Sequence, residues 1–149
     1  MGYTIQAVIG PAALLTTVVA EQPGAALIGL PQGIAMMPMT DEVFDAVNAG
    51  ADEGLGFWKL PAGYPGKLSA WSVAGPVGYA EAEFFGGAGG QRAALWVAGR
   101  LAWGPVSEGE GSPISLLLRK LGVTRGTHHD EFDALGLGRH RDTEDWPAR

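Results

Sequence analysis

Residues 79–105 read YAEAEFFGGAGGQRAALWVAGRLAWGP, and this stretch decides the fold. It holds three short runs of residues that favour β-strands, separated by a glycine-rich loop and by Gly99-Arg100. A two-residue turn with glycine in first place is typical of a β-hairpin. The stretch therefore predicts an antiparallel meander over residues 78–104.

Side chains along a strand alternate between its two faces, so the meander separates its residues into two sets. One face of the first strand carries small or apolar side chains: Ala80, Ala82 and Phe84. Glu81 and Glu83 share the opposite face of that strand with Tyr79. With the turn at Gly99-Arg100, Trp96 lies opposite Trp103, and the two indoles pair across the hairpin.

Two helices are predicted from their capping residues. Thr40 precedes DEVFDAVNAG, and Ser112 precedes PISLLLRKL with proline in the first helical position. We expect these helices at 41–49 and 113–121, covering one side of the sheet. A short last helix is expected near residues 130–135.

The N-terminal part of the chain is less clearly patterned. Tyr3–Ile9 predicts a strand, and Pro11 then opens a helix to about residue 21, although its β-branched residues leave a second strand as the alternative. Ala25–Leu30 and Ile34–Met39 are interpreted as two strands, or as one strand and an apolar loop. Pro38 places the second run at a sheet edge.

A length of 149 residues fits one domain, so the prediction is a single α+β domain over 1–149. Residues 50–68 form an expected loop whose aromatic residues either line a pocket or cap the core, and the charged tail from about 137 is expected to be irregular. The expected core is Ile5, Val8, Val43, Phe44, Val47, Phe84, Leu95, Val97, Leu101, Ile114, Leu117, Leu118 and Leu121.

The net charge of the chain favours some classes of binding partner over others. The net charge is −6 and the isoelectric point about 4.9, which disfavours nucleic acid and is compatible with a basic protein partner. The absence of cysteine excludes disulfides and thiolate chemistry and fits a cytoplasmic location. The apolar run Ile5–Ala20 is interrupted by polar residues and is shorter than the ~20 residues of a membrane span, so no membrane association is expected.

Three groups of residues have the residue types of known kinds of site. Gly86–Gly90 lacks the lysine and hydroxyl residue of a phosphate loop, so no cofactor is expected. Glu81 and Glu83, roughly 6.5–7 Å apart on one strand face, could serve as acid and base in a small hydrolase or ligand-binding protein, with His128 as another candidate. His128 and the acids after it have metal-ligand chemistry but no ligand spacing, so no metal site is expected.

The favoured hypothesis places an interaction surface on the meander. Aromatic anchors surrounded by charged residues are typical of protein interfaces. The residues expected on this surface are Glu81, Glu83, Arg92, Trp96 and Trp103. They predict a non-enzymatic protein-binding domain, and the same surface could instead form a homodimer. Packing of both tryptophans under a helix, with no role in binding, is the alternative.

A resemblance adds to this hypothesis. The combination of EAEFFGGAGGQRAALW with SPISLLLRKLGV and DEFDALGLGRHRDTEDW resembles small bacterial proteins of unassigned function from GC-rich genomes, some of them treated as toxin-immunity proteins. It covers about residues 78–146. The resemblance implies a toxin-immunity role and assigns no functional residue. The aromatic and acidic residues predict that the mechanism is occlusion of the toxin.

Overall fold

The computed structural model describes residues 2–47, 57, 64–85, 88–107, 112–140 and 142–147. Its six strands form one antiparallel sheet in the order β2-β3-β1-β4-β5-β6. The strands are β1 (Gly2–Pro11), β2 (Ile28–Gly29), β3 (Ile34–Pro38), β4 (Val77–Phe85), β5 (Ala88–Val97) and β6 (Arg100–Ser107). The helices are α1 (Ala12–Ala20), η1 (Pro31–Gly33), α2 (Asp41–Val47), α3 (Tyr64–Trp71), α4 (Pro113–Lys120), α5 (Glu131–Ala134) and η2 (Thr143–Asp145). The α+β class and the meander are confirmed.

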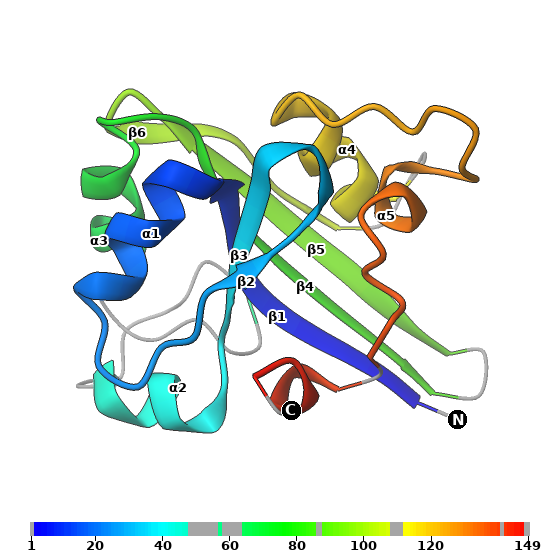
Figure 1. Ribbon diagram of the computed structural model, residues 1–149, viewed down its shortest axis with the longest axis horizontal. Coiled ribbons are helices and arrows are strands. Elements are labelled where there is room, and N and C mark those ends of the chain that lie inside the picture. Colours follow the sequence, from blue (N-terminus) through cyan, green and yellow to red (C-terminus); the bar gives the residue numbers. More distant parts are fainter. Residues whose placement is uncertain are drawn as a thin grey trace.

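Helices cover both faces of the sheet (Figure 1). We call the side covered by α1, α2 and α3 the α1 face, and the side covered by α4 and α5 the α4 face. The expectation that the helices near 41–49 and 113–121 share a side is wrong. Val43 of α2 packs with Val8 of β1, whereas Leu117 of α4 packs with Ile5 on the other face. Because β1 is central and apolar on both faces, each face needs its own cover.

The packing of α4 on the sheet depends on a glycine of β4. A Cβ atom added at Gly78 would lie 2.5 Å from Cδ1 of Leu117, so the absence of a side chain makes room for this leucine. Leu117 is fully buried. Ser112 caps α4 as predicted, because its hydroxyl accepts a hydrogen bond from the backbone N–H of Ser115 at 3.4 Å.

The β5–β6 hairpin differs from the expected register. Its turn is Ala98-Gly99, with φ angles of 54° and 87°. Ser72 holds this turn, since its carbonyl accepts from Ala98 N–H at 3.1 Å and its hydroxyl accepts from Gly99 N–H at 2.9 Å. Trp96 therefore lies opposite Leu101 and belongs to the α1 face, while Trp103 lies opposite Leu95 and packs on the α4 face. The predicted pairing of the two indoles is wrong.

Two further expectations change at the N-terminal strands and at the long loop. β3 lies between β2 and β1, and it tolerates Pro38 because β2 pairs only with Ala35 and Met36. α3 begins at Tyr64, inside the expected loop, and Tyr64 is fully buried in the core. Trp58, another aromatic residue of the expected loop, lies outside the described residues.

The predicted core is largely confirmed. The buried members are Ile5, Val8, Val43, Leu95, Ile114, Leu117 and Leu118, and the partly buried ones are Phe44, Phe84 and Leu121. The prediction that Val97 and Leu101 belong to the core is wrong, because 37% and 39% of their surface is exposed beside the hairpin turn. The side chain of Val47 lies outside the described part.

Candidate functional site

The structure does not bring the five predicted partner-binding residues to one surface. Glu81 and Trp96 are 0% and 1% exposed, because α1, α2 and α3 cover the α1 face where they lie. Glu83 is exposed at the end of β4, and Arg92 is half-buried and donates from Nε to Ser107 Oγ at 3.1 Å. The idea of one exposed surface is therefore wrong, and the role of Glu83 and Arg92 in partner binding stays a prediction.

Trp103 lies on the opposite side of the sheet from Glu81. It is half-buried, and the Lys120 ammonium lies 5.3 Å from the centre of its ring. The bulge between β5 and β6 and the position of the hairpin turn together direct this indole to the α4 face. Trp103 can therefore not join Glu81 in one contact surface.

Glu81 belongs to a buried polar pair. The Tyr79 hydroxyl donates to Glu81 Oε2 at 3.2 Å, and the Phe57 ring meets the Tyr79 ring edge-on at 5.0 Å. Burial raises the pKa of Tyr79, and the charge and hydrogen bond of Glu81 raise it further. Both side chains are fully buried, and Tyr79 belongs to the apolar core of the α1 face.

The residues proposed for hydrolysis are also separated. Glu81 is on the α1 face, whereas His128 is exposed in the segment between α4 and α5. His128 Nδ1 lies 3.2 Å from Asp133 Oδ2, with more than half of both side chains exposed. Among the described residues, no three His, Asp or Glu side chains are close enough to hold a metal ion.

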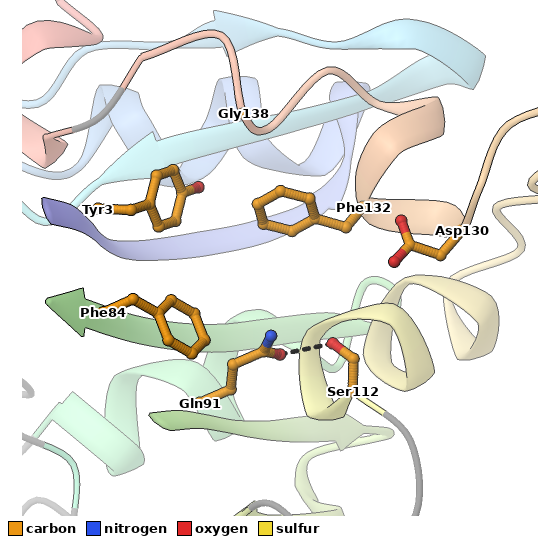
Figure 2. Close-up of a pocket in the computed structure, with 7 residues that line it drawn as sticks. All are labelled: Tyr3, Phe84, Gln91, Ser112, Asp130, Phe132 and Gly138. Carbon is orange, nitrogen blue, oxygen red and sulfur yellow. Dashed lines mark hydrogen bonds between the residues drawn. The ribbon is translucent and has the colours of Figure 1, made fainter. Parts of the chain in front are cut away.

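A cavity of about 260 Å³ opens on the α4 face, between the start of β1 and α5 (Figure 2). Tyr3 and Phe84 are direct neighbours on β1 and β4, and Phe132 of α5 lies over them. Its lining residues are Tyr3, Phe84, Gln91, Ser112, Asp130, Phe132 and Gly138. Rings from three separate elements thus bound a space that also has polar groups at its edge.

The polar side of the cavity is fixed by the cap of α4. Gln91 Oε1 accepts from Ser112 Oγ at 2.6 Å and from the backbone N–H of Ile114 at 3.0 Å. In the sequence Ser112 is recognisable as a helix cap, but Gln91 has no local signal. Only the fold brings this β5 amide to the start of a helix that follows β6.

The aromatic wall is fixed by the segment after α5. The Tyr3 hydroxyl donates to the carbonyl of Leu137 at 2.7 Å, and the rings of Tyr3 and Phe132 pack edge-to-face at 5.7 Å. Burial raises the pKa of Tyr3 above its ordinary value, which further favours the protonated hydroxyl that donates to Leu137. The tail expected to be irregular contributes here to a defined wall, and Leu137 is fully buried.

Beside the cavity, α4 and α5 are joined by an ion pair. Arg119 Nε donates to Glu131 Oε2 at 3.2 Å, and Glu131 is 4% exposed. Burial works to raise the pKa of Glu131, but the Arg119 hydrogen bond, a backbone hydrogen bond and the charges of Arg119 and Arg125 together hold it below its ordinary value. The pair fixes the position of α5 and therefore of Phe132.

A second surface feature is an acidic patch formed by α2 and η2. The two elements are in contact, because the backbone N–H of Asp41 donates to Glu144 Oε2 at 2.7 Å. Neither residues 41–47 nor residues 142–147 contain lysine or arginine, and the two arginines that flank the second segment in the sequence, Arg141 and Arg149, lie outside the described residues. The exposed carboxylates of the acidic patch are Asp41, Glu42, Asp45, Asp142, Glu144 and Asp145.

Comparison with protein-family models, with curated proteins and with solved structures gives no match for this chain. In the described part of the chain, no helix has the length and apolar character needed to cross a membrane. The function must therefore be inferred from the described side chains. They offer two features, the aromatic cavity and the acidic patch.

Proposed function

We propose that this chain is a non-enzymatic protein-binding domain that recognises a basic partner, and that it acts as an immunity-type protein that neutralises a toxin by occlusion. The observation that supports this proposal is the acidic patch. Its carboxylates come from segments about a hundred residues apart in sequence, and the fold gathers them on one surface. The exposed carboxylates of the two segments place negative charge on this surface, and negative charge attracts a partner with a positively charged surface.

The patch suits recognition rather than chemistry. Its carboxylates are exposed, and an exposed charge contributes more to the rate of encounter than to the final affinity. Glu42 and Asp41 stand in the first turn of α2, where the helix dipole favours negative charge, so the patch is compatible with a stable helix. Long-range attraction would bring a basic toxin surface to the patch. The bound domain would then cover that surface and neutralise the toxin by occlusion.

The test uses the product of the reading frame beside the gene of this chain. Under the proposal, that product is toxic when made alone in bacterial cells, and co-production of this chain restores growth. With the purified pair, the association rate should fall by about tenfold or more as salt is raised from low to physiological concentration, as expected for electrostatic steering. Growth inhibition that this chain does not relieve would remove the immunity function.

A matched pair of variants tests the acidic patch. Asp45→Asn with Asp145→Asn neutralises one carboxylate in each segment, whereas Val73→Lys with Thr127→Lys changes the net charge by the same amount at exposed positions elsewhere. The first variant should associate several-fold more slowly and with a weaker salt dependence, and the second should differ little from the unmodified chain. Equal rates for the two variants would exclude the patch, and slow association of Glu83→Lys alone would favour the end of β4 instead.

A further inference from the structure

The cavity on the α4 face has a hydrogen-bond donor whose orientation follows from its neighbours. The backbone N–H of Ile114 can only donate, so the Gln91 atom 3.0 Å from it must be the oxygen. The hydroxyl of Ser112 donates to the same oxygen. The amide nitrogen of Gln91 consequently points into the cavity, as Figure 2 shows, and it makes no hydrogen bond with any residue in the described part of the chain.

The cavity also has a fixed acceptor. Asp130 caps α5, and its Oδ1 accepts from the backbone N–H of Asp133 at 2.8 Å. This bond holds the carboxylate in place and leaves Oδ2 without a hydrogen bond among the described residues. Figure 2 shows the Asp130 carboxylate at the edge of the cavity, beyond Phe132 and on the same side as Ser112.

The rings define the shape of the molecule that fits. Tyr3 and Phe132 form one side of the cavity, and Phe84 and the Gln91 side chain form the other (Figure 2). Aromatic rings on both sides favour an apolar, ring-shaped ligand between them. The Tyr3 hydroxyl already donates its hydrogen to the Leu137 carbonyl, so inside the cavity it can only accept.

Size sets a second limit. Sites for drug-sized ligands have volumes of roughly 300–1,000 Å³. The cavity has about 260 Å³ and is partly open, so a single ring or a fused pair of rings is enough to fill it.

We propose that this cavity is a binding site for a small amino-substituted nitrogen heterocycle. The amino group of the ligand donates to Asp130, a ring nitrogen or carbonyl accepts from the amide of Gln91, and the ring lies between Phe84 and Phe132. No bond is made or broken. The site is independent of the acidic patch, because the two have no residue in common.

Two isosteric substitutions isolate these contacts without removing structure. Gln91→Glu keeps an oxygen to accept from Ser112 and Ile114 but replaces the donor in the cavity by a second acceptor. Asp130→Asn keeps the oxygen that caps α5 and removes the negative charge, and asparagine is itself a good cap. Thr127→Glu and Val73→Lys are the controls, since they change the net charge by the same amounts at exposed positions that do not line the cavity.

The experiment is calorimetric titration, with ligand-observed NMR, of the purified chain with adenine, cytosine and 2-aminopyrimidine. Purine and pyrimidine, which have no amino group, are the comparison compounds. We expect at least one amino compound to bind about tenfold or more tightly than its parent ring, because a missing hydrogen bond leaves a fixed polar group unpaired. Gln91→Glu and Asp130→Asn should each weaken that binding by about tenfold or more, and the controls should leave it unchanged.

Three results would overturn the proposal. The first is no binding of any amino compound at millimolar concentration to a chain whose circular dichroism shows it to be folded. The second is equal affinity for amino compounds and their parent rings. The third is binding that survives both Gln91→Glu and Asp130→Asn, since the ligand would then occupy another place.

Discussion

The contact between Leu117 and Gly78 allows a quantitative test of how α4 is held on the sheet. Leu117→Ala removes three carbon atoms from a fully buried side chain. The lost transfer free energy is about 2.4 kcal/mol at about 0.8 kcal/mol per carbon. The cavity left behind raises the expected loss in the free energy of unfolding to about 3–4 kcal/mol.

Gly78→Ala acts at the same place by the opposite mechanism. The added methyl would lie 2.5–3.1 Å from the end of the Leu117 side chain, so one of the two groups must shift. Overpacking of this kind costs about 1–3 kcal/mol. In the double variant the new methyl enters the space that Leu117 has left, and the total loss should be smaller than the sum of the single losses by about 1–2 kcal/mol.

Urea unfolding followed by circular dichroism and by tryptophan fluorescence measures all four proteins of this cycle. The control cycle combines Gly78→Ala with Val43→Ala, which lies on the α1 face, and its losses should add to within about 0.5 kcal/mol. If Gly78→Ala and Leu117→Ala were strictly additive, the two residues would not be in contact. The described position of α4 would then be wrong.

Three further predictions concern other parts of the fold. Ser72→Ala removes the hydroxyl that accepts from Gly99 N–H, and it should lower the free energy of unfolding by about 1–2 kcal/mol. Ser69→Ala is the control. A loss for Ser72→Ala no larger than the loss for Ser69→Ala would mean that Ser72 does not hold the turn. Because the pKa of Glu131 is lower in the folded chain than in the unfolded chain, its contribution is present above pH 4.5 and is lost as the pH falls through the lower, folded value. Glu131→Gln should therefore be less stable than the unmodified chain at pH 7, and the difference should shrink at pH 3; a constant difference in urea midpoints would contradict this. Tyr3→Phe removes the hydroxyl that donates to Leu137 and should cost about 1 kcal/mol, and equal stability of the two proteins would show that this bond does not hold the tail.

The parts of the fold that the sequence predicts are those set by neighbours in the chain. The α4 cap at Ser112 and the three strands of the meander depend on local spacing and turn residues, and both are confirmed. The hairpin register does not follow from local sequence, because Ser72, far away in the chain, holds Ala98 in a left-handed conformation that alanine rarely adopts on its own. Local rules favoured glycine at the start of the turn, and a tertiary contact outweighed them.

The candidate sites were less predictable, because each depends on contacts between distant segments. Gln91 carries no local signal of a site, and it becomes part of one only through the α4 cap. The acidic patch depends on the hydrogen bond between Asp41 and Glu144. Strand alternation assigns Glu81 to one face of the sheet but does not predict which helices cover that face. The burial of Glu81 therefore does not follow from the sequence.

The central position of β1 also has a consequence for the order of synthesis. This strand leaves the ribosome before all the others, yet Ile9 pairs with Gly78 and Gly2 with Phe85, so its longest partner is made much later. Until β4 has emerged, β1 is an apolar strand in the nascent chain with one long edge unpaired. That edge can pair with other chains or bind chaperones. Substitutions that lower the apolar character of β1 should therefore change the yield of folded protein in cells more than they change the stability of the finished domain.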